Sequence, residues 1–129
     1  MDRPAVETPV AITQEYAEAL LLVLTRTAHG WPLPLQEAFS QQTDALAIQL
    51  TLDPQADGYC PSADHLSAAL YTLHDLGRLL ERAYAAHLIP TKRYLLLRQL
   101  HHATTRRVAQ LAMRASRIDH TLETLLVSF

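Results

Sequence analysis

The hydrophobic residues of this chain recur at intervals of three and four, the spacing that places them on one face of an α-helix. The longest such run covers residues 91–117, contains no Gly or Pro, and predicts a helix of roughly 40 Å at about 1.5 Å per residue. One face of this helix is apolar and is expected to enter a core. Its positions are Leu97, Leu100, Thr104, Val108, Leu111, Ala115 and then Ile118.

Three shorter runs with the same spacing come before it. The first is expected to begin at Thr13, a residue type favoured at the N-cap, and to end near Gly30. The second begins at Pro34 and ends before Asp53-Pro54, because proline disfavours a helical conformation in the residue before it. The third begins at Ser62. The apolar positions of these helices are Tyr16, Ala17, Leu20, Leu21 and Leu24, then Leu35, Phe39, Leu46 and Leu50, then Leu66, Leu70, Leu73, Leu76, Leu80 and Tyr84.

Four amphipathic helices with short connections predict an all-α protein, an antiparallel up-down-up-down four-helix bundle. Residues 1–12 hold two prolines and show no helical spacing of hydrophobic residues, so we expect a flexible arm there and a bundle over residues 13–129. The tail, residues 118–129, keeps an apolar spacing of its own, and either extends the fourth helix or folds back as a short fifth one with buried apolar side chains. Gly77 inside the third helix either marks a close contact between helices or is tolerated there without a role.

Composition adds a charge asymmetry to this picture. The chain has 129 residues, enough for one domain, and a net charge of −2. Residues 78–117 nevertheless hold nine of the eleven Lys and Arg and one acid, whereas residues 1–77 hold ten acids. A chain polarised in this way often meets an anionic partner with its basic half. The alternatives are a solvated helix face, or pairing of the basic and acidic halves across subunits.

The helical wheel places several of these cations opposite the apolar face of the fourth helix, which forms a basic stripe. The stripe consists of Lys92, Arg106, Arg107, Arg114 and Arg117. On the same helix, Leu95 and Leu96 lie off the core face, and the tail adds Leu125, Leu126 and Phe129. Together these residues give more apolar surface than four helices need to bury. We therefore expect the protein to associate with itself. The aromatic residues Trp31, Tyr84 and Tyr94 either stack on bases or cap the core at helix ends.

Motifs for catalysis, metal and cofactors are absent from the sequence. His101 and His102 are adjacent and point about 100° apart on a helix, and neither H-E-x-x-H nor Glu-x-x-His occurs. We expect His101 to flank the apolar face and His102 to face solvent. Cys60, the single cysteine, has no basic neighbour to lower its pKa, and no P-loop or G-x-S-x-G is present. The sequence thus predicts a protein that is not an enzyme, with no catalytic residue, metal or cofactor.

No signal peptide and no apolar run long enough to cross a bilayer is visible. A cytoplasmic protein without a membrane partner is expected.

Two segments together resemble a known family. The first is the pair Trp31-Pro32 followed by LQEAFSQQ. The second runs over residues 70–117, with Arg78 and Arg82 in a leucine repeat, then an Ile-Pro link, and Arg106 one turn before an apolar stretch. The chain is similar to the bacterial four-helix-bundle proteins encoded in ribosomal-RNA intervening sequences, a family that includes the accessory variability determinant of diversity-generating retroelements.

This resemblance implies a function and a set of partners. It implies a homopentameric accessory protein that binds the phosphate backbone of RNA or DNA. It also implies binding to the retroelement reverse transcriptase, supporting mutagenic synthesis of cDNA from template RNA. The implied basic contacts are Arg78, Arg82 and Arg106. The wheel adds Lys92, Arg107, Arg114 and Arg117 as candidate binding residues, and Arg93 beside Lys92 is a further candidate. The alternative is a protein-interaction module, such as an adaptor, antitoxin or immunity protein, that binds no nucleic acid.

Overall fold

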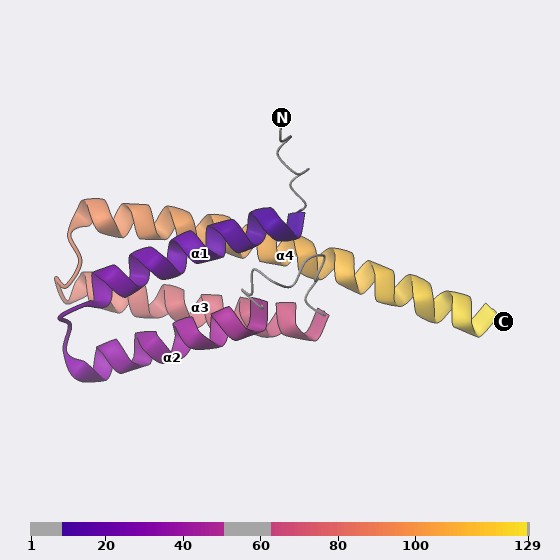
Figure 1. The fold of residues 1–129 in the computed structure, drawn as a ribbon, viewed down its shortest axis with the longest axis horizontal. Helices are drawn as coiled ribbons and strands as arrows, with labels where there is room; N and C mark the ends of the chain where they lie inside the picture. The colour runs from indigo at the N-terminus through magenta and orange to yellow at the C-terminus, as the bar shows by residue number, and fades with distance from the viewer. Residues whose placement is uncertain (1–8, 51–62, 129) are drawn as a thin grey trace, which may run out of the picture.

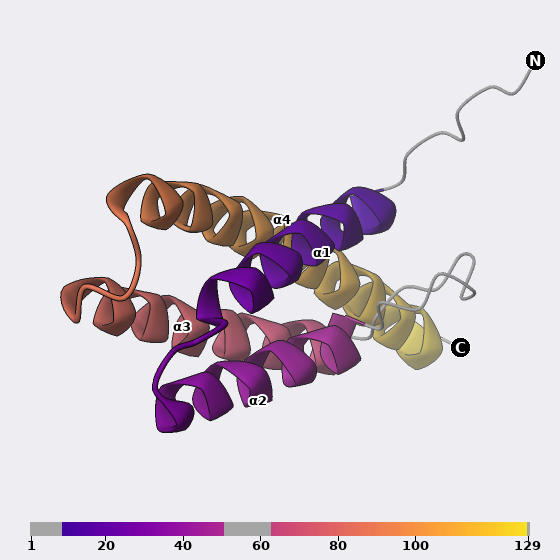
Figure 2. The same cartoon turned by 60° about the vertical axis from the view of Figure 1, so that its left-hand side comes forward.

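Four antiparallel helices form the bundle (Figure 1). The computed structural model describes residues 9–50 and 63–128, with the side chains of residues 10–50 and 63–117. The helices are α1 (Pro9–Ala28), α2 (Leu33–Leu50), α3 (Ala63–Ala85) and α4 (Thr91–Ser128). Contacts join α1 to α4, α4 to α3 and α3 to α2, and α1 and α2 touch least (Figure 2). The predicted all-α, up-down-up-down bundle is confirmed.

The core contains the apolar positions that the helical spacing selects. Leu97, Thr104, Val108 and Leu111 of α4 are buried, and α4 packs on α1 and α3. The fully buried large side chains of the other helices are Leu20, Leu24, Phe39, Leu46, Leu50, Leu66, Leu73 and Leu76. The predicted apolar face of α4 is therefore confirmed over the residues whose side chains are described.

The connection from α1 to α2 is compact because each residue in it has a distinct conformational role. Gly30 adopts φ of 85°, a conformation that L side chains rarely accept, and it ends α1. Trp31 then turns inward, with its ring edge-on to Phe39 at a centroid separation of 4.8 Å. The Pro32 carbonyl accepts the first backbone bonds of α2, from the N–H groups of residues 35 and 36.

The connection from α3 to α4 closes in a similar way with a different residue. The Leu88 N–H donates to the Ala83 carbonyl at 2.9 Å, and the His87 N–H donates to the Tyr84 carbonyl at 3.0 Å. These two bonds form a Schellman motif, whose left-handed position is usually a glycine. Here His87 takes that position, with φ of 61°.

The start of α1 differs from the sequence prediction. Thr13 was expected to cap the helix, but α1 begins at Pro9 and Thr13 is buried. Proline suits the first turn because its missing N–H is not needed there and its φ is already helical. The predicted arm over residues 1–12 therefore overlaps α1 from Pro9 onward. The rest of that arm lies outside the described residues, as do residues 51–62, which include Cys60 and the predicted cap Ser62.

Helix α4 is longer than the other three. It continues without interruption to Ser128, and Figure 1 shows its last turns passing beyond the ends of its neighbours. Of the two predictions for the tail, extension of the fourth helix is the one observed. The prediction that the tail's apolar side chains are buried concerns side chains outside the described set.

Gly77 permits a close contact between α3 and α4. A Cβ atom at this position would lie 3.0 Å from Cε1 of His101. The same ring donates a hydrogen bond from Nε2 to the Leu73 carbonyl. Gly77 therefore marks a close helix contact, the first of the two roles that the sequence left open.

Candidate functional site

The predicted binding residues occupy several separate places on the bundle. Arg78 and Arg82 of α3 line a hollow of about 280 Å³ on the side facing α2, together with Asp75. An anion in that hollow would meet a carboxylate as well as two arginines. This mixed lining makes it the weaker anion site.

The first turn of α4 holds a second group. Lys92 and Arg93 are exposed there, and Arg93 donates a hydrogen bond from Nη1 to the Thr27 hydroxyl at 3.2 Å. Arg114 lies 22 residues further along the same helix, or about 33 Å at 1.5 Å per residue. Lys92 and Arg93 therefore cannot share a small ligand with the arginines of the second half of α4.

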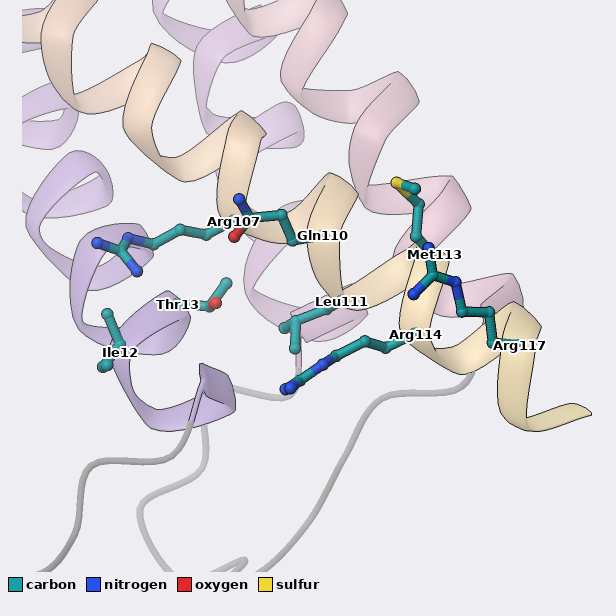
Figure 3. Close-up of a pocket in the computed structure, with 8 residues that line it drawn as sticks. All are labelled: Ile12, Thr13, Arg107, Gln110, Leu111, Met113, Arg114 and Arg117. Carbon is teal, nitrogen blue, oxygen red and sulfur yellow. The ribbon is translucent and has the colours of Figure 1, made fainter.

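Three predicted residues do gather in one pocket, at the crossing of α4 and the first turns of α1 (Figure 3). The pocket has a volume of about 440 Å³. We call it the arginine pocket. It is lined by Ile12 and Thr13 of α1 and by Arg107, Gln110, Leu111, Met113, Arg114 and Arg117 of α4. Arg106 is exposed on α4 and does not line this pocket.

The spacing of the α4 residues explains why they meet. Arg107, Gln110, Arg114 and Arg117 follow at intervals of three and four, so they share one side of the helix. That side borders α1 because the neighbouring core residue Leu111 points into the bundle and is buried. The pocket thus combines an apolar inner wall with a cationic and amide rim.

A contact with an aromatic ring holds Arg107. Its Cζ lies 4.4 Å from the centroid of the Tyr16 ring. This interaction orients the guanidinium without an opposing charge, so the positive charge is retained. Among the described residues, no carboxylate forms an ion pair with Arg107 or Arg114.

The guanidinium groups surround the hollow and do not converge on one point. Figure 3 shows Arg107 reaching toward α1 and Arg114 running beside Leu111 to a different part of the rim. From residue 107 to residue 117, α4 rises about 15 Å. Cations distributed over this length suit an extended anion with several charges better than a single small ion.

The aromatic residues considered for base stacking are in contact within the fold. Trp31 is buried against Phe39. Tyr84 and Tyr94 stack on each other, with centroids 4.0 Å apart and planes 7° from parallel. The Tyr84 hydroxyl also bonds to the Thr91 hydroxyl at 3.2 Å. Of the two predicted roles, these rings take the one at helix ends.

The histidines take the positions expected of them. His101 is half-buried against Gly77 and bonded to the Leu73 carbonyl, and His102 is exposed. Among the described side chains, those of residues 10–50 and 63–117, no three His, Cys, Asp or Glu are grouped as metal ligands would be.

Two features of the pocket were missed by sequence reasoning. Tyr16 was assigned only to the apolar face of α1, although it also holds Arg107. Ile12 was assigned to the arm, although it lines the pocket. The signal that could have revealed both features is Pro9, a residue type favoured in the first turn of a helix. A helix that starts there has one more turn beside the second half of α4.

Comparison with known proteins adds no assignment. No family model, curated protein or solved structure matches the chain. None of the helices in the described part of the chain is both long and apolar enough to cross a membrane. The candidate site therefore rests on the geometry and charge of the arginine pocket.

Proposed function

We propose that this protein binds nucleic acid by its phosphate backbone, and that the arginine pocket is the principal contact. The observation that carries the proposal is the grouping of Arg107, Arg114 and Arg117 around one hollow. Guanidinium groups match phosphate geometry and keep their charge at every physiological pH. A rim of several arginines along one helix side suits consecutive phosphates.

The chemistry of the pocket supports backbone contact without sequence reading. Phosphate contacts position a protein on nucleic acid, while base-edge contacts specify sequence. The polar uncharged lining groups are Thr13 and Gln110, which is a small set for base recognition. The predicted partner is therefore RNA or DNA of broad sequence.

A finer role follows from the resemblance alone. In that role the protein is an accessory factor that brings nucleic acid to a retroelement reverse transcriptase. The signal for it is the pair of sequence segments described above, with Arg78, Arg82 and Arg106 as the implied contacts. Co-purification of the protein with a reverse transcriptase encoded beside it tests this role. Treatment with ribonuclease shows whether RNA bridges the two proteins.

The direct experiment is a fluorescence anisotropy titration of a labelled single-stranded RNA with the full chain at low salt. The double variant Arg107→Gln with Arg114→Gln removes two charges from the pocket. Each charged hydrogen bond contributes about 1.5 kcal/mol or more, so the loss of both should raise the dissociation constant about a hundredfold. Circular dichroism should show an unchanged helical fold, because Arg114 is exposed and the contact of Arg107 with the Tyr16 ring contributes only about 0.5–2 kcal/mol.

The matched control is the double variant Arg26→Gln with Arg98→Gln, which removes the same charge from exposed residues outside the predicted binding set. In the same titration at about 0.15 M salt, we expect it to change the dissociation constant less than about threefold, because exposed charges farther away than the Debye length of about 8 Å are screened. Equal losses in the two variants would mean diffuse attraction to net charge, and the pocket would not be the site. If the wild-type chain binds no RNA or DNA at low salt, the alternative function, a protein-interaction module that binds no nucleic acid, replaces this proposal.

A further inference from the structure

A second hollow lies on another face of the bundle, between α1 and α2. Its volume is about 480 Å³, and the buried side chains of Leu24, Ala28 and Phe39, none more than 7% exposed, form an apolar wall at its floor. Leu33 at its edge is 65% exposed. The hollow exists because α1 and α2 make the least extensive contact of the neighbouring helix pairs. We call it the α1/α2 groove.

The groove has a negative rim. Glu37 and Asp44 line it, both are exposed, and they stand seven residues apart on one side of α2. The other polar groups lining it are hydroxyls and an amide, and no Lys or Arg of the described residues lines it. An apolar wall with acids along its edge fits a helix that presents leucines flanked by lysine or arginine.

The start of α4 presents that surface. Leu95 is 50% exposed and Leu96 is 43% exposed. Lys92 precedes them and Arg98 follows them, and both are exposed. We call these four residues the α4 patch. Its apolar and basic groups complement the α1/α2 groove in both hydrophobicity and charge.

One chain cannot join the two surfaces within itself. Helix α4 packs on α1 and α3 and makes no contact of comparable extent with α2, so the patch and the groove lie on different faces of the bundle. Since both surfaces belong to the same chain, the complement of each is available on a second copy.

We propose that the α1/α2 groove is the docking site for the α4 patch of a second copy of this chain. The contact joins two different surfaces, so it is heterologous, and each added copy brings a further groove and a further patch. Neither surface includes the arginine pocket, so this assembly does not depend on nucleic acid.

The test is sedimentation velocity of the full chain, without nucleic acid, from micromolar to hundreds of micromolar concentration. Wild type is expected to associate as concentration rises. The groove variant Glu37→Lys with Asp44→Lys, and the patch variant Lys92→Glu with Arg98→Glu, each place like charges across the contact. We expect each to weaken association at least about tenfold, because like-charge juxtaposition across an interface is strongly unfavourable.

Mixing makes the test specific. In an equal mixture, the basic groove of the first variant meets the acidic patch of the second, and the acidic groove of the second meets the basic patch of the first. Association should return in the mixture, although each variant alone associates at least about tenfold more weakly than wild type. A control, Asp75→Lys with Glu81→Lys, makes the same charge change on exposed residues of α3 outside the groove and should associate as wild type does.

A third variant removes the apolar part of the contact. Leu95→Gln with Leu96→Gln should keep the helical fold, because both side chains are already exposed in the single chain, and should lose association. Three results would overturn the proposal: wild type that stays monomeric at every concentration, control and groove variants that lose association equally, or a mixture that stays dissociated. RNA binding by the arginine pocket can persist in all three cases, so failure here is separate from failure of the proposed function.

Discussion

Replacing Gly77 with alanine sets two effects of opposite sign against each other. Alanine in a helix interior is favoured over glycine by about 1 kcal/mol. The new Cβ, however, would lie 3.0 Å from Cε1 and 3.1 Å from Nε2 of His101. The ring cannot simply turn away, because Nε2 is bonded to the Leu73 carbonyl and the side chain is half-buried between α3 and α4.

The steric effect should be the larger one. Overpacking of this kind costs about 1–3 kcal/mol. Displacing the ring also sacrifices its hydrogen bond, which contributes about 1 kcal/mol. After the helix-propensity gain is subtracted, Gly77→Ala should lower the free energy of unfolding by about 1–3 kcal/mol.

A double-mutant cycle isolates this contact. In a His101→Ala background the ring is gone, so the same Gly77→Ala change should raise the free energy of unfolding by about 1 kcal/mol. Urea denaturation of the wild type, the two single variants and the double variant gives the coupling, which we expect on the order of 2 kcal/mol or more. If Gly77→Ala has the same effect in both backgrounds, His101 does not pack on residue 77 and the reasoning is wrong.

Three other positions allow sharp tests of stability. His87→Gly should raise the free energy of unfolding by about 1 kcal/mol, because His87 holds φ of 61° at the end of α3. Gly30→Ala is the opposite change at the end of α1, where φ is 85° and no neighbouring atom lies within 4 Å, and thermal denaturation should show a loss of about 1 kcal/mol. Trp31→Ala should cost about 3–5 kcal/mol in urea denaturation because it empties a buried site beside Phe39, and a cost below about 1 kcal/mol would place Trp31 outside the core.

Helix existence and the buried faces were predictable because they depend on local signals. Glycine at position 30 and proline at position 90 separate the runs, and the spacing of leucines selects the face of each helix. The helix start at Pro9 was not predicted, because a threonine four residues later offers an equally good capping signal. Such choices between nearby caps are settled by packing, here by the burial of Thr13.

Contacts between helices were not predictable from the spacing. A wheel shows that Gly77 and His101 each lie near an apolar face, but the axial position of α3 against α4 decides whether they meet. The same is true of the basic stripe. The wheel grouped Lys92 with Arg114 by angle, whereas the pocket depends on which stretch of α4 lies beside the first turns of α1.

The salt dependence of RNA binding distinguishes contacts along the whole basic stripe from contacts confined to the arginine pocket. For single strands, log K falls with log salt at a slope of about −0.7 for each phosphate neutralised. Contacts from Arg107, Arg114 and Arg117 alone predict a slope of roughly −2, and contacts from all eight predicted cations would give roughly −6. Anisotropy titrations of one labelled single-stranded RNA over a series of salt concentrations give the slope directly.

With Arg107→Gln and Arg114→Gln together, one pocket arginine remains and the slope should fall to roughly −0.7. A wild-type slope steeper than about −4 would mean that cations outside the arginine pocket take part, and the binding surface would then extend along the whole of α4 or onto α3.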